Sequence, residues 1–184
     1  MHLRPVIFLD IDDVIALDPE CSGKAVANGF SNNWIGVQPD FWVRIFSNDA
    51  RQNLANLHEI FSPQFVISSS WCNYLSLEQM MIIFSRTELD FIGQNLHEKW
   101  RTPRLESFGR LAEIQTWIRK YHQQRQAILI LDDYESGWNL INSDFDKKNL
   151  VIFCEPRLGF DISKLTIAID SLQRQISSGF IGVD

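Results

Sequence analysis

The sequence predicts an α/β fold, with a parallel β-sheet covered by helices on both faces. Short apolar runs rich in β-branched residues alternate along the chain with stretches whose apolar residues recur at helical spacing. Strands that alternate with helices are joined by right-handed crossovers and therefore run parallel. Several of the apolar runs end in acids or serines, and in parallel sheets ligands bind beyond these carboxyl ends of the strands.

Residues 6–9 and 65–67 are the first two predicted strands, because both runs are short and wholly apolar. Between them, residues 49–61 have helical spacing, and Pro63 ends the helix. Residues 17–48 contain Gly, Asn, Pro and aromatic residues without a clear period, so we expect an irregular flap there.

The remaining elements follow from the same signals. They are a capping box at residues 76–79 with a helix to about residue 86, a short strand at 91–92, a helix from near Ser107, strands at 127–131 and 150–153, and a last helix from residue 161 or 163 to about 176.

The composition suits one globular domain, which we expect to span residues 1–184. No stretch approaches the roughly 20 apolar residues of a membrane helix, so we expect no membrane association. The three cysteines are scattered and form no Cys-x-x-Cys pair, which argues against a disulfide framework or a structural zinc site. A cytoplasmic location is therefore expected.

A basic patch interrupts the acidic chain, whose net charge is −6. Between residues 99 and 125, seven lysines and arginines stand against two acids, a local excess of five positive charges. Trp100, Trp117 and Tyr121 interleave with these cations, a mixture that can bind nucleic-acid backbone and bases. Helical spacing explains the aromatic residues more simply, as the core side of a helix with a solvated charged face. Both interpretations stay open at this point.

Two acidic strand ends predict a metal site. Asp10 and Asp12 lie two positions apart after the first strand and can face the same side, while Asp132 and Asp133 end a later strand. Acids can simply end strands and cap turns, but three or four carboxylates gathered at one sheet edge repel one another. A hard divalent cation removes that repulsion, and oxygen ligands favour Mg²⁺ over zinc.

The order of these motifs resembles the haloacid dehalogenase-like (HAD-like) phosphatases. The matching residues are Phe8-Leu9-Asp10-Ile11-Asp12, then Ser68-Ser69-Ser70, then a basic residue opening a helix, then Ile130-Leu131-Asp132-Asp133. The chain is more narrowly similar to small members linked to RNA end repair, through Ser69-Ser70-Trp71, Thr102-Pro103 and Arg110-Leu111-Ala112-Glu113-Ile114. The resemblance implies a Rossmann-like sheet with a minimal cap, formed by the flap only.

The resemblance also implies roles for the acids. Asp10 would attack phosphorus and form an aspartyl-phosphate, and Asp12 would protonate the leaving oxygen and later activate water. Mg²⁺ would be held by the Asp10 carboxylate, the Asp12 backbone carbonyl and the Asp132 carboxylate. Asp133 would be a more distant or alternative ligand.

The phosphate-binding residues are implied in the same way. Ser69 is favoured for the hydroxyl donor, with Ser68 as the rival, and Arg110 would supply the cation that the family more often supplies as Lys. Asp13 departs from the family, which usually has Gly at that position. Asp tolerates unusual turn conformations better than most residues, so we expect the fold to be unaffected.

The expected function is thus a Mg²⁺-dependent phosphomonoesterase. Its partner would be a phosphorylated small molecule, a nucleotide or a polynucleotide end, and residues 17–38 and 72–99 are expected to cover the site. The alternative is a non-catalytic phosphate- or nucleic-acid-binding module. A two-component receiver fits poorly because the acid pair follows the late strand, and a serine hydrolase fits poorly because Gly-x-Ser-x-Gly is lacking.

Overall fold

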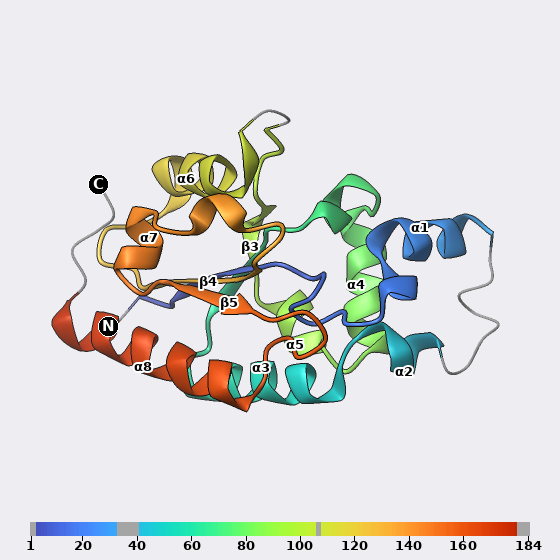
Figure 1. The fold of residues 1–184 in the computed structure, drawn as a ribbon, viewed down its shortest axis with the longest axis horizontal. Coiled ribbons are helices and arrows are strands. Elements are labelled where there is room, and N and C mark those ends of the chain that lie inside the picture. Colours follow the sequence, from blue (N-terminus) through green and yellow to red (C-terminus); the bar gives the residue numbers. More distant parts are fainter. Residues whose placement is uncertain (1–2, 33–40, 106–107, 180–184) are drawn as a thin grey trace.

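A computed structural model describes residues 3–32, 41–105 and 108–179, and shows a five-stranded sheet in which all pairs are parallel (Figure 1). The strand order is β3-β2-β1-β4-β5, so β1 is central and β3 lies at an edge. The strands are β1 (Val6–Leu9), β2 (Gln64–Ile67), β3 (Leu96–Arg101), β4 (Ile128–Asp133) and β5 (Val151–Cys154). The predicted α/β fold is confirmed.

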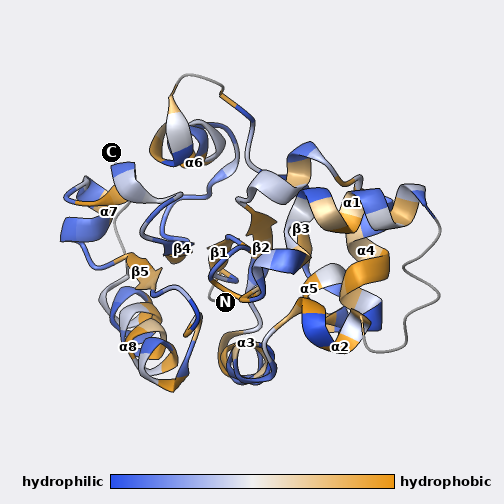
Figure 2. Ribbon diagram, turned by 45° about the vertical axis from the view of Figure 1, so that its right-hand side comes forward, coloured by the Kyte–Doolittle hydropathy of each residue, from blue (hydrophilic) through white to orange (hydrophobic). Residues whose placement is uncertain are grey.

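Helices cover both faces of this sheet, as expected. Helices α3 (Asn48–Phe61) and α8 (Ile162–Ser178) lie on one face, and α6 (Gly109–Tyr121) and α7 (Asp144–Lys147) lie on the other (Figures 1 and 2). Alternate residues of β1 separate into two buried clusters. Ile7 and Leu9 pack with α3 and α8, while Val6 and Phe8 pack with α6 and α7. This alternation is the period of two of an extended chain buried on both sides.

The helix boundaries follow local capping signals. Helix α3 begins after Ser47, whose side chain accepts a hydrogen bond from the Ala50 amide, and it ends at Ser62 in a left-handed conformation. Helix α4 (Leu77–Arg86) has the predicted capping box, since the side chains of Ser76 and Gln79 each accept from the other's backbone amide.

The expectation of an irregular flap over residues 17–48 is wrong for most of the described part. The chain forms a 3₁₀ turn, η1 (Pro19–Cys21), and two short helices, α1 (Gly23–Ser31) and α2 (Phe41–Ile45). These helices bury only two or three residues each, among them Val26 and Ile45, which is too few to produce a readable period. Residues 33–40 lie outside the described residues.

The strand predicted at residues 91–92 is also wrong. Those residues lie in a short helix, α5 (Asp90–Gln94), and the third strand is β3. Strand β3 contains no fully buried residue and carries His97, Glu98 and Lys99 in its middle, so it offers no apolar run. An edge strand is partly exposed on several sides, which removes the signal that marked the inner strands.

Candidate active site

The carboxyl ends of β2, β1 and β4 bring three polar side chains to one level of the sheet. Leu9 pairs with Ile67 on one side and with Leu131 on the other. The next residues are Asp10, Ser68 and Asp132. The Asp10 amide donates to the Leu131 carbonyl at 2.9 Å, which continues the ladder by one step beyond β1.

Three of the predicted acids form one buried cluster. Each of Asp10, Asp132 and Asp133 has a carboxylate oxygen within 4.8 Å of those of the other two. Their residues are 1%, 0% and 4% exposed, respectively. The Asp12 carboxylate is not part of this cluster, although Asp12 lies only two positions after Asp10 in the chain. The structure thus brings three of the four predicted acids together and leaves the Asp12 carboxylate outside their cluster.

Arg110 is the cation of this cluster. Its Nη2 donates to Asp10 Oδ2 at 3.0 Å, and its Nε lies 2.9 Å from Asp132 Oδ2 without hydrogen-bond geometry. The residue is only 8% exposed. Burial alone would lower the pKa of Arg110, but the Asp10 and Asp132 carboxylates raise it, so the guanidinium stays charged. One cation therefore faces three carboxylates.

Gly109 allows Arg110 to reach this position. Its backbone φ is +69°, and a Cβ there would lie 2.2 Å from Asn139 Nδ2. A side chain would therefore be strained and would also displace Asn139. Asn139 belongs to the 3₁₀ turn η3 (Trp138–Leu140), and its Oδ1 accepts from the Leu111 amide at 3.2 Å. The first turn of α6 is thus capped from a distant part of the chain.

Ser136 is a site residue that the sequence analysis missed. Its Oγ lies 2.7 Å from both Asp10 Oδ2 and Asp132 Oδ1, and it also reaches Asp133 Oδ2. A hydroxyl has one hydrogen, so it donates to one of these acceptors at a time. Ser136 follows Asp132 by four residues in a polar loop that has no motif, so no sequence signal indicated it.

The donor set fits a hard divalent cation. The cluster offers carboxylate oxygens, which Mg²⁺ prefers. Asp132 Oδ2 is buried and has no hydrogen-bond partner among the described residues, so it has capacity for another ligand. Burial and the neighbouring Asp10 carboxylate raise the pKa of Asp132 well above its ordinary value, although Arg110 opposes this. A bound cation would relieve the same repulsion.

Asp12 is held apart by two hydrogen bonds from the 3₁₀ turn η2 (Ser70–Asn73). The indole Nε1 of Trp71 donates to Oδ1 at 2.8 Å, and Ser70 Oγ donates to Oδ2 at 3.2 Å. Burial raises the pKa of Asp12, the Trp71 hydrogen bond lowers it, and Asp10 raises it further, with a net rise. A carboxyl group with a raised pKa suits general acid catalysis.

The backbone conformation of Asp13 explains why Asp can stand where the HAD-like phosphatases usually have Gly. Its φ is 55°, in the left-handed region, which Gly adopts readily and Asp tolerates. Burial and the nearby Asp133 carboxylate raise the pKa of Asp13. The extra acid thus sits beside the cluster without changing the turn.

The two candidate serines have different surroundings. Ser68 Oγ lies 3.4 Å from Arg110 Nη1 and 3.5 Å from Thr102 Oγ1. Ser69 Oγ accepts from the Trp71 amide at 3.4 Å and so caps η2. Ser69 lines the neighbouring cleft, whereas Ser68 lies behind it against Arg110.

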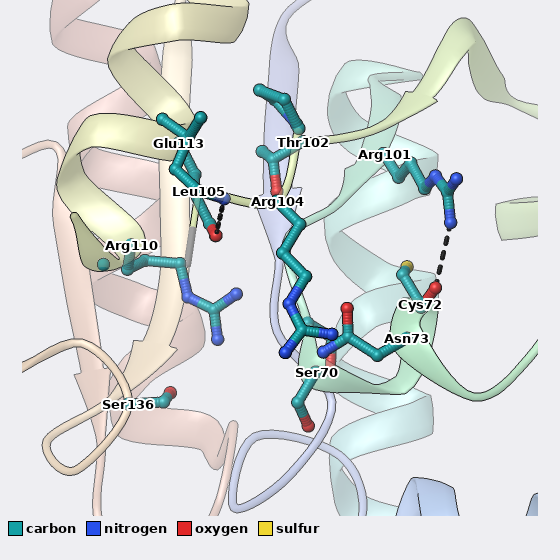
Figure 3. A pocket seen from close by; sticks show the side chains of 13 residues that line it. Ser70, Cys72, Asn73, Arg101, Thr102, Arg104, Leu105, Arg110, Glu113 and Ser136 are labelled. Atoms are coloured by element: carbon teal, nitrogen blue, oxygen red, sulfur yellow. Dashed lines mark hydrogen bonds between the residues drawn. The ribbon is translucent and has the colours of Figure 1, made fainter. Parts of the chain in front are cut away.

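A cleft of about 480 Å³ opens above Arg110 (Figure 3). It is lined by Ser69, Ser70, Cys72, Asn73, Arg101, Thr102, Pro103, Arg104, Leu105, Gly109, Arg110, Glu113 and Ser136. The side chain of Arg104 extends into it near Asn73 and Ser70, while Glu113 is turned to the Leu105 amide, which donates to its Oε1 at 3.0 Å. Arg110 already contacts Asp10 and Asp132, so Arg101 and Arg104, against the single lining acid Glu113, are the residues that favour an anionic ligand here.

The two segments expected to cover the site behave differently. Among the described residues of the segment 17–38, none lines the cleft. The segment 72–99 contributes Cys72 and Asn73 at its start. The remaining walls come from Ser69 and Ser70, from the end of β3 and the chain after it, from the first turns of α6 and from Ser136. Among the described residues, the segment 17–38 therefore contributes no wall of the cleft.

Among the described helices, none has the length and apolar content that crossing a membrane requires.

The family comparison covers the elements that form this site. Comparison with curated proteins and with solved structures found no match. The model of one family, the HAD domain in Swiss Army Knife RNA repair proteins, matches residues 6–164, which include all the acids and Arg110. The chain belongs to this family and is a HAD-like phosphatase-type domain related to RNA repair.

Proposed function

We propose that this chain is a Mg²⁺-dependent phosphomonoesterase that removes a phosphate from a nucleotide or polynucleotide end. The observation that carries the proposal is the position of Asp10. Its carboxylate contacts Arg110 at 3.0 Å and belongs to the three-acid cluster, directly beside a cleft lined by arginines. The proposed nucleophile therefore lies next to the arginine that would bind phosphate and to the carboxylates that would hold Mg²⁺.

Asp10 would act as the nucleophile. The Ile11 amide donates to Asp10 Oδ1 at 2.8 Å, which holds the carboxylate orientation. One carboxylate oxygen forms a bond to phosphorus while the ester P–O bond breaks, and the leaving oxygen takes a proton from Asp12. Water then attacks the aspartyl-phosphate and gives its proton to Asp12, which releases inorganic phosphate and restores Asp10. Two displacements replace one difficult hydrolysis.

The negative charges of Asp10 and of the substrate phosphate would be stabilised by Mg²⁺ and by the arginines around the site. Mg²⁺ held by Asp10, Asp132, Asp133 and the Asp12 carbonyl would supply charge neutralisation between the anionic nucleophile and the anionic phosphate. Arg110 would exchange its contact with Asp10 for the phosphate oxygens, with Ser69 or Ser68 as hydroxyl donor. Arg101 and Arg104 would attract the rest of an anionic substrate toward the cleft.

Two observations support a nucleic-acid end as the substrate. The matching family is described by its occurrence in RNA repair proteins. The cleft is also lined by Arg101 and Arg104 in addition to Arg110, which would suit a substrate that carries more negative charge than one phosphate.

The test is phosphate release from p-nitrophenyl phosphate and from 3′- or 5′-phosphorylated oligonucleotides, with and without Mg²⁺. Asp10→Asn should abolish release, and Asp12→Asn should reduce it by about 100-fold or more. Asp170→Asn is the matched control, because Asp170 is an exposed residue of α8. Phosphate binding without turnover on any of these substrates would instead identify a non-catalytic module.

A further inference from the structure

A second groove lies beside the cleft, between the edge strand β3 and helix α6. Its volume is about 290 Å³, and it shares Arg101, Thr102 and Pro103 with the cleft. The other lining residues are Glu98, Lys99, Trp100, Thr116, Trp117, Lys120 and Tyr121. The two hollows are therefore adjacent at the end of β3. The proposed catalytic residues do not use this second groove.

The groove is cationic. Lys99, Lys120 and Arg101 line it, against the single acid Glu98. Lys99 Nζ is 3.8 Å from Glu98 Oε1, beyond hydrogen-bond distance, and both side chains are largely exposed, so this pair neutralises little. The Arg101 guanidinium lies 5.2 Å from the centre of the Trp100 ring and donates to the Cys72 carbonyl at 2.9 Å. Arg101 is thus held at the junction of the two hollows.

One wall of the groove is aromatic, and its residues differ in exposure. Trp117 is 1% exposed, and its Nε1 donates to the Lys99 carbonyl at 2.8 Å, which joins α6 to β3. Tyr121 packs edge-on against Trp117, with ring centres 5.5 Å apart, and remains 37% exposed. Trp117 is therefore core, as helical spacing indicated, whereas Tyr121 presents an aromatic surface beside Lys120 and the groove.

We propose that this groove binds the part of a single-stranded polynucleotide that adjoins its phosphorylated end. The inference rests on the proposed function, because the terminal phosphate would lie in the cleft. A polynucleotide repeats its phosphate at each residue, which matches a second set of cations directly beyond the first. A row of cations next to an exposed aromatic ring is the arrangement that holds a strand through backbone charge and base stacking.

The experiment measures binding, so it does not depend on turnover. Asp10→Asn protein is titrated with a fluorescein-labelled, end-phosphorylated single-stranded octanucleotide and with the matching mononucleotide, at several salt concentrations. The test variant adds Lys99→Gln and Lys120→Gln. The control variant adds Lys147→Gln and Lys148→Gln, which remove the same charge from exposed positions outside both hollows.

The test variant should bind the octanucleotide roughly ten- to thirtyfold more weakly at 0.1 M salt, and its salt slope should fall by about 1.4, because two phosphate contacts are lost. The ratio of octanucleotide to mononucleotide affinity should fall accordingly. An unchanged ratio and slope, or an equal loss in the control variant, would overturn the groove assignment. Phosphate release by the native chain from p-nitrophenyl phosphate and from the phosphorylated oligonucleotides decides the phosphatase proposal separately, so either proposal can fail without the other.

Discussion

The indole nitrogen of Trp71 donates a 2.8 Å hydrogen bond to Asp12 Oδ1, and Trp71 is completely buried. This bond, together with the one from Ser70, turns the Asp12 carboxylate away from the cluster formed by Asp10, Asp132 and Asp133. Two acids only two residues apart thereby acquire different surroundings: Asp10 lies among other carboxylates, and Asp12 lies against neutral hydrogen-bond donors. Such a division is what a nucleophile and a separate proton donor require.

Trp71→Phe removes this donor while retaining a large ring. We expect kcat to fall by about tenfold with a smaller change in KM, since Asp12 loses its orientation. The Trp71 hydrogen bond lowers the pKa of Asp12, so its loss should also move the limb of the pH–kcat profile that reports Asp12 to higher pH. Trp42→Phe, at a half-buried indole remote from Asp12 in the chain, is the control. A profile identical to that of the native chain would refute the positioning role.

Arg110→Met leaves the buried acids without their cation. Removing one partner of a buried ion pair typically costs about 3–5 kcal/mol, so the free energy of unfolding should fall by that amount in the absence of Mg²⁺. Urea denaturation measures this loss. Mg²⁺ should restore more stability in the variant than in the native chain, because it replaces part of the missing charge. Arg119→Met, an exposed residue of the same helix, should leave stability within about 0.5 kcal/mol.

Ser136→Ala tests the hydroxyl that lies among the three carboxylates. Groups that orient metal ligands commonly contribute about 10–100-fold to affinity, so we expect Mg²⁺ to bind at least about tenfold more weakly. Isothermal titration calorimetry gives the affinity directly. Ser177→Ala, at an exposed position of α8, is the matched control. Native Mg²⁺ affinity in the Ser136 variant would show that the hydroxyl only packs beside the acids.

Mg²⁺ should stabilise the folded chain, because only the folded state gathers the acids. The expected gain is about 2.7 kcal/mol at a Mg²⁺ concentration 100 times the dissociation constant. A thermal-unfolding series with added Mg²⁺, and then EDTA, measures the shift in Tm. Asp132→Asn should remove most of this response, whereas Asp170→Asn should keep it. An equal response in both variants would place the bound cation elsewhere.

Asp161 makes the stability of α8 depend on pH. Its Oδ1 accepts from Ser163 Oγ and from the Lys164 amide, and these bonds, the Ser163 bond foremost, hold the pKa of Asp161 below its ordinary value. The stabilisation is therefore present above about pH 4, the unfolded value, and is lost as the pH falls through the lower folded value. Asp161→Ala should cost about 1 kcal/mol at pH 7. Urea denaturation at a series of pH values checks this.

Asp161→Asn is the control for that measurement, since Asn caps helices equally well but does not titrate. Its free energy of unfolding should match that of the native chain at pH 7 and show no loss from this position in acid. A constant difference between the Ala variant and the native chain at all pH values would contradict the assigned pKa.

The inner strands could be predicted because burial on both faces requires apolar residues at every position, as in β1 and β4. Their acidic ends then located Asp10 and Asp132 at one edge. Strand β3 could not be predicted, because an edge position permits polar residues along its length. Ser136 was missed for a different reason. A serine in a polar loop carries no pattern, and only the turn around Gly137, where a Cβ would lie 2.6 Å from the Asp133 carbonyl, brings it back to the acids.

Residues on the exposed edge of the sheet tolerate substitution more readily than the buried residues of the candidate site. Asp10, Asp132 and Arg110 are embedded in close-packed surroundings, where most substitutions disturb several neighbours at once. Lys99 and Lys120 stand on the surface, where substitutions usually alter stability by less than about 0.5 kcal/mol. Substitutions at Lys99 and Lys120 should therefore change the charge of this surface one residue at a time while the buried acids and Arg110 stay undisturbed.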